Sequence, residues 1–91
     1  MLDLKQKYKL NDNIILRRID DKCWALNIEN GNQYRLNDTS YFILDLLRET
    51  STIENIIFII QNEYKVTREQ LIADISLMLQ VAINKNILKE V

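Results

Sequence analysis

The alternation of apolar and polar positions divides the chain into an early part that favours strands and a later part that favours helices. Residues 14–19 are mostly β-branched or apolar, which is typical of a strand. Residues 23–28 alternate with a period of two, and this period indicates a strand with one buried face. A third strand, residues 33–36, follows the turn dipeptide Asn30-Gly31, because both turn residues tolerate positive φ.

The period of two also sorts the side chains of these strands into opposite faces. In the second strand, Trp24 is predicted to be a core anchor of the sheet. In the third strand, Tyr34 and Leu36 share the face that we expect to join the core. Gln33 and Arg35 then lie on the opposite face. Two roles stay open for Arg35: it pairs with an acidic residue of a ligand, or it is an ordinary solvated surface arginine.

Capping residues and apolar spacing predict three helices after the last strand. Asn37 is placed to cap the first helix. Ser51 and Glu54 form a capping box for the second helix, and Thr67 begins another one at the third. Asn86 stands where the third helix would end in a left-handed residue, a conformation that asparagine accepts better than most.

This order predicts an α+β fold that is winged helix-turn-helix-like, with a three-stranded antiparallel sheet followed by three helices. We expect residues 1–91 to form a single domain, because the chain is short and contains no proline or linker-like tract. Residues 1–12 are weakly patterned and predict either a short strand around Tyr8 or a loose arm.

The strand 33–36 is the last one before the helices, so one of its edges is predicted to lack a partner. An open edge presents N–H and C=O groups onto which an extended peptide can add as a further strand. The third helix carries a second apolar strip beside its core stripe, because five of its residues fall within one sector of the helix. The predicted peptide-binding residues are therefore Asn32, Gln33, Tyr34, Arg35, Leu36, Asp74, Leu77, Met78, Val81 and Lys85.

Simpler explanations stay open for several of these residues. Leu77 and Val81 could equally be ordinary exposed apolar residues, which all proteins have. They could also contact the N-terminal arm or a second copy of the chain. Tyr34 and Leu36 are expected to place their side chains in the core, while their backbone still contributes to binding. A dimerisation or adaptor module that uses the free edge or the Leu77/Val81 strip is accordingly an alternative function.

Composition argues against an enzyme. The chain has no histidine and one cysteine, Cys23, which excludes most nucleophilic and zinc chemistry. The only glycine, Gly31, stands in a hairpin turn, so no phosphate-binding glycine loop is present. We predict no catalytic residue, no metal site and no cofactor. The lone thiol fits a reducing compartment, and residues 1–10 lack the apolar core of a signal peptide or membrane span, so we expect a cytoplasmic protein.

DNA binding is the main alternative, because winged helices often bind DNA. The formal net charge is −1, however, and no strong field favours nucleic acid. In the third helix, the positive charges of Arg68 and Lys85 are offset by the negative charges of Glu69 and Asp74. The helix therefore lacks the basic surface that a DNA-recognition helix needs. The predicted sheet also precedes the helices, whereas the usual wing follows the recognition helix. We therefore expect no binding to nucleic acid.

Several segments resemble PqqD-like proteins, over about residues 13–90. The run 33–40 followed by residues 42–47 resembles the strand-to-helix junction of that family, and residues 24–26 resemble its preceding strand. Residues 63–66 resemble the passage before its last helix. Asn86 departs from the pattern, because the family usually has glycine there.

The resemblance implies a RiPP recognition element, a domain that binds the leader segment of a ribosomally synthesised precursor peptide. In that family the leader adds as a strand to the third strand and lies in a groove against the third helix. Typical partners are a radical SAM enzyme, a cyclase or a leader peptidase, to which the domain presents the precursor. On this basis we expect a non-enzymatic peptide chaperone.

Overall fold

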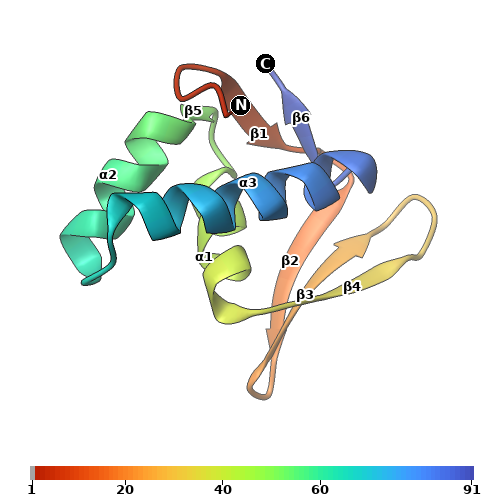
Figure 1. The fold of residues 1–91 in the computed structure, drawn as a ribbon. Coiled ribbons are helices and arrows are strands. Elements are labelled where there is room, and N and C mark those ends of the chain that lie inside the picture. The colour runs from red at the N-terminus through yellow and green to blue at the C-terminus, as the bar shows by residue number, and fades with distance from the viewer. Residues whose placement is uncertain (1) are drawn as a thin grey trace.

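The computed structural model describes residues 2–91, so Met1 of the predicted arm lies outside the described residues. The helices and strands, in chain order, are β1 (Lys7–Leu10), β2 (Ile14–Ile19), β3 (Lys22–Asn27), β4 (Gln33–Leu36), α1 (Asp38–Leu46), β5 (Ser51–Thr52), α2 (Ile53–Glu63), α3 (Arg68–Asn84) and β6 (Leu88–Glu90). The α+β class is confirmed, and the predicted strands β2, β3 and β4 precede the three predicted helices (Figure 1).

The strands β2, β3 and β4 form an antiparallel sheet in that order. A tight turn joins β2 to β3, where Ile19 pairs with Lys22 and Asp20 takes a φ of 55°. The turn between β3 and β4 is longer than a two-residue hairpin, and at the predicted Asn30-Gly31 dipeptide only Gly31 has positive φ, at 77°. The buried side chain of Asn27 supports this turn by accepting hydrogen bonds from the backbone N–H groups of residues 29 and 30.

The inward face of β3 is the one with the small side chains. Cys23 and Ala25 are buried, whereas Trp24 is only half-buried on the opposite face. The prediction that Trp24 anchors the core is therefore wrong. Its indole ring instead lies beneath the guanidinium group of Arg35, whose Cζ atom is 5.7 Å from the ring centroid, on the outer face of the sheet. Tyr34 lies opposite Ala25 and packs half-buried against the core, as predicted for its face.

A second small sheet, β5-β1-β6, gathers the two ends of the described chain (Figure 1). The strand β1 pairs antiparallel with both β5 and β6, and the Val91 N–H donates to the Lys7 carbonyl oxygen at 3.0 Å. Residues 7–10 are thus a strand around Tyr8, which is one of the two states expected of this segment. The sequence patterns did not predict β5 and β6.

Side-chain caps mark the start of each helix. Asn37 accepts a hydrogen bond from the Ser40 N–H at 2.7 Å, as predicted for the cap of α1. Thr67 likewise caps α3. The cap of α2 is Thr52 and not the predicted Ser51, because the Thr52 hydroxyl oxygen is the one that accepts from the Asn55 N–H, at 3.1 Å.

The chain turns sharply after α3 and returns to the core. Asn86 has the predicted left-handed conformation, with a φ of 58°. Ile87 and Leu88 follow it and are both buried. In the core they join buried side chains from both sheets and from α1, α2 and α3. Within residues 2–91, no helix is long and apolar enough to cross a membrane.

Candidate functional site

The strand β4 forms one edge of the β2-β3-β4 sheet, as predicted. In the described residues 2–91 it pairs with β3 alone. An edge strand carries backbone N–H and C=O groups along its outer side that can template another strand. The structure therefore contains the open edge on which the predicted peptide site depends.

The register shows which backbone groups of β4 point outward. The Asn27 N–H donates to the Asn32 carbonyl oxygen at 2.8 Å, so this opposed pair is a hydrogen-bonded one. Hydrogen-bonded and non-hydrogen-bonded pairs alternate along an antiparallel ladder. Tyr34 and Leu36 therefore direct their backbone groups toward β3, whereas Gln33 and Arg35 direct theirs toward the open edge.

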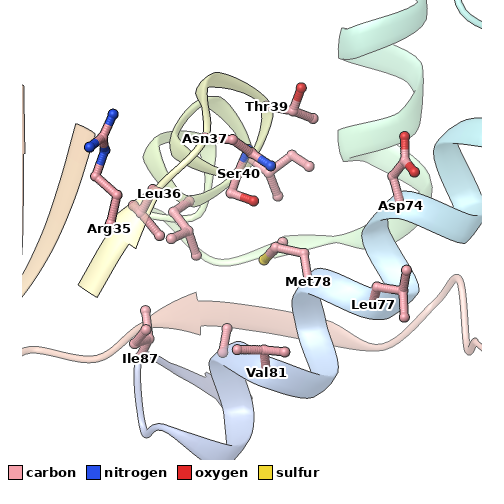
Figure 2. A pocket seen from close by; sticks show the side chains of 13 residues that line it. Arg35, Leu36, Asn37, Thr39, Ser40, Asp74, Leu77, Met78, Val81 and Ile87 are labelled. Atoms are coloured by element: carbon pink, nitrogen blue, oxygen red, sulfur yellow. The ribbon is translucent and has the colours of Figure 1, made fainter. Parts of the chain in front are cut away.

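A groove of about 450 Å³ lies between β4, the first turns of α1 and the helix α3. Figure 2 shows Met78 reaching from α3 toward Leu36 across this space. We call it the β4–α3 groove, and it is lined by Arg35, Leu36, Asn37, Thr39, Ser40, Ile43, Leu44, Asp74, Leu77, Met78, Val81, Ala82 and Ile87.

Six of the predicted site residues meet in this groove, namely Arg35, Leu36, Asp74, Leu77, Met78 and Val81. Leu77 and Val81 are 68% and 53% exposed, so the second apolar strip of α3 does face away from the core. Their participation in peptide binding stays a prediction. An exposed apolar surface next to an open strand edge is nevertheless the arrangement that such binding requires.

The other four predicted residues lie outside the lining of the groove, around the first half of β4. The Lys85 Nζ atom lies 5.0 Å from the centroid of the Tyr34 ring, which places a positive charge from the end of α3 over this strand. The Asn32 side-chain amide donates to the Tyr34 hydroxyl oxygen at 3.3 Å. Gln33 is exposed. The contact between Lys85 and Tyr34 thus brings the end of α3 close to the beginning of β4.

Sequence reasoning missed the part of the groove that α1 supplies. Thr39, Ser40, Ile43 and Leu44 were assigned to no site, because their helix was considered only as a core element. One signal could have identified them. Asn37 caps α1 directly after β4, so the first turns of that helix must lie beside the strand end.

Two further hydrogen bonds join side chains in this region. Cys23 is buried and its thiol donates to the Asp38 carboxylate at 3.6 Å. The Asp74 carboxylate accepts from the Gln70 side-chain amide at 3.0 Å, one turn earlier on α3. In the part of the chain that the structure describes, no group of three or more His, Cys, Asp or Glu side chains is placed to hold a metal ion.

Comparison with known proteins identifies the family of this chain. The family model of coenzyme PQQ synthesis protein D (PqqD) matches residues 23–88. A solved structure of TbiB1 in complex with the TbiA(beta) leader peptide has 30% sequence identity and a TM-score of 0.76, covering 89% of this chain and 94% of TbiB1. A structure of lasso peptide synthetase B1 complexed with the leader peptide has 21% identity and a TM-score of 0.75, covering 90% and 96%, which shows a shared fold. No curated protein matches. The family model and the TbiB1 match together show that this chain belongs to the PqqD family.

Proposed function

We propose that this protein binds the leader segment of a ribosomally synthesised precursor peptide and presents that peptide to a modifying enzyme. One observation carries the proposal: the edge of β4 is unpaired within residues 2–91 and lies beside an apolar groove. TbiB1, which has 30% sequence identity to this chain, was solved in complex with a leader peptide. Binding of a leader peptide also fits the geometry of the β4–α3 groove.

The peptide would add to β4 as a further strand of the β2-β3-β4 sheet. The outward N–H and C=O groups of Gln33 and Arg35 would supply hydrogen bonds that do not depend on the sequence of the peptide. Specificity would come from the groove, where Leu77, Met78 and Val81 offer apolar surface to alternate side chains of the peptide.

In this function the protein acts as a peptide chaperone without chemistry of its own. A precursor held by its leader experiences a raised effective concentration of its core at the active site of a partner, which accelerates modification without a new catalytic group. A radical SAM enzyme, a cyclase or a leader peptidase would be a suitable partner, and the cytoplasm, where precursors are translated, would be the place of action.

A titration of the ¹⁵N-labelled protein with a synthetic leader segment tests this proposal. The probe is the leader of a short precursor encoded beside the gene of this chain. We expect the backbone amide signals of Gln33, Arg35, Leu77 and Val81 to shift, while those around Phe58 on α2 stay in place. Unchanged amide signals across residues 32–37 at saturating peptide would contradict strand addition.

A further inference from the structure

A second pocket of about 210 Å³ lies where the beginning of α1, the end of α2 and the beginning of α3 meet. We call it the helix-end pocket, and it is lined by Asp38, Thr39, Phe42, Ile60, Tyr64, Val66, Leu71 and Asp74. It is smaller than the β4–α3 groove, and the function proposed above assigns it no ligand.

The walls of this pocket are apolar and aromatic. Phe42 and Tyr64 stack edge to face, with ring centroids 5.6 Å apart and an interplanar angle of 87°. Leu71, another lining residue, is buried, whereas Tyr64 and Val66 are 53% and 40% exposed. An aromatic pair that remains partly open to solvent provides a surface against which a long side chain can lie.

Two acidic residues, Asp38 and Asp74, also line the pocket. The ion pairs found among residues 2–91 join Arg48 to Asp45 and Lys89 to Asp12, so neither lining carboxylate is neutralised by a described lysine or arginine. Apolar walls with unneutralised carboxylates fit a lysine or arginine side chain. Its methylene stem would pack against the rings and its cation would pair with the carboxylates.

The helix-end pocket is continuous with the β4–α3 groove, because Thr39 and Asp74 line both. Figure 2 shows the two side chains at the end of the groove toward which β4 runs. A peptide that follows the edge of β4 past Leu36 therefore arrives at the pocket. The pocket is reached from the proposed peptide path and needs no second ligand.

We propose that the bound peptide extends beyond the groove and inserts a lysine or arginine side chain into the helix-end pocket. This inference rests on the proposed function and names the class of peptide that the site selects. Because Asp74 lines both pockets and Leu77 lines the groove, the basic residue should stand a short, fixed number of positions from the peptide residue that contacts Leu77.

Selection from a displayed library of random peptides, long enough to span both pockets, tests this inference without knowledge of the natural precursor. Wild-type protein should enrich peptides in which a basic residue stands at a fixed spacing from an apolar one. The double variant Asp38→Asn/Asp74→Asn should keep the apolar preference and lose the basic one. Asparagine preserves the side-chain oxygen that accepts from Cys23 and from Gln70. Glu69→Gln removes an exposed acid of α3 that lines neither pocket, and it is the matched control.

Fluorescence anisotropy with one enriched peptide then quantifies the contact. Replacing its basic residue with glutamine should weaken binding to wild-type protein about fivefold to tenfold, as expected for a partly exposed, charge-assisted contact. The same replacement should change affinity less than about twofold in the double variant.

The outcomes separate this inference from the proposed function. Enrichment of no peptide by the wild-type protein would overturn both. Enriched peptides that lose binding in Leu77→Asp but show no basic preference would overturn the inference alone. A basic preference that survives in Asp38→Asn/Asp74→Asn would also overturn it, since the charge would then be recognised elsewhere.

Discussion

At the scale of single residues, the exposed apolar side chains of α3 are the most informative. Leu77 and Val81 are exposed on the groove side of the helix, and both line the β4–α3 groove. Phe58 on α2 is as exposed as they are, at 64%, but lines neither pocket. The chain thus provides a matched comparison between apolar residues inside and outside the proposed site.

Leu77→Asp and Val81→Asp should each weaken leader-peptide binding at least about tenfold. Covering an apolar anchor contributes roughly 1.5–3 kcal/mol, and about 1.4 kcal/mol corresponds to tenfold in affinity. Isothermal titration calorimetry measures the effect, and urea denaturation should show that the fold survives, because both side chains are exposed. Phe58→Asp is the control that should bind normally. Unchanged affinity in the two groove variants would contradict the site.

Tyr8 links a single residue to the pH dependence of stability. It is buried in the core, and this burial, together with the negative charges of Glu90 and Asp3, raises the pKa of its phenol above the ordinary value. The unfolded chain then loses the proton first. The contribution of Tyr8 to the free energy of unfolding should be constant below about pH 10 and fall as pH rises from there to the pKa of the folded state. Tyr8→Phe should remove this component of the decline in urea titrations at several pH values.

The assignment of faces in β3 illustrates what a residue pattern determines. The alternation correctly separated Trp24 from Cys23 and Ala25, but a period of two is symmetric and does not identify the inward face. The large apolar side chain of Trp24 suggested that its face points inward, whereas the structure shows that the face of Cys23 and Ala25 does. Because α1 packs closely over this sheet, the small side chains are the ones that fit beneath it. That constraint arises from tertiary packing and has no signal within the strand.

At the scale of elements, β4 has two chemically different sets of backbone groups. Gln33→Pro or Arg35→Pro removes an outward N–H, so leader-peptide affinity should fall severalfold or more while the fold persists, as edge strands tolerate proline. Tyr34→Pro or Leu36→Pro removes a hydrogen bond to β3 and should lower the free energy of unfolding by about 1–3 kcal/mol. Calorimetry and urea denaturation separate the two effects.

Alanine variants complete this comparison. Gln33→Ala and Arg35→Ala keep the backbone N–H, so they report the contribution of the side chains alone. An equal loss of affinity in the alanine and proline variants would argue against strand addition, because the backbone donors would then be dispensable. An equal loss of stability in all four proline variants would contradict the register derived from the Asn27–Asn32 hydrogen bond.

Periodicity predicted the longer elements well and the short strands poorly. The strands β2 to β4 and the helices α1 to α3 bury apolar stripes that repeat along their own sequence. The strands β5 and β6 are only two and three residues long, too short to show a period, and each exists because β1 lies beside it. The α1 side of the groove was missed for a related reason. A helical wheel describes one helix, and a groove is a property of several elements together.

At the scale of the whole molecule, the segment after α3 connects the proposed site to the second sheet. Ile87 lines the β4–α3 groove, and the next residue, Leu88, begins β6 and lies in the core. Antiparallel pairing of β6 with β1 fastens this segment to the beginning of the described chain. One wall of the groove is therefore held in place by the pairing of β1 with β6, whose residues lie near opposite ends of the sequence.

Leu88→Ala should lower the free energy of unfolding by about 2–5 kcal/mol, because the side chain is 2% exposed and its removal leaves a cavity in the core. Lys89→Ala, at the exposed neighbouring position, should change it by less than about 0.5 kcal/mol. Urea denaturation measures both. Leader-peptide affinity of the folded Leu88→Ala fraction should stay near that of wild type, since Leu88 lines neither pocket. A loss of less than about 0.5 kcal/mol in Leu88→Ala would mean that β6 does not unfold together with the core. The second sheet would then not be needed to hold the groove in shape.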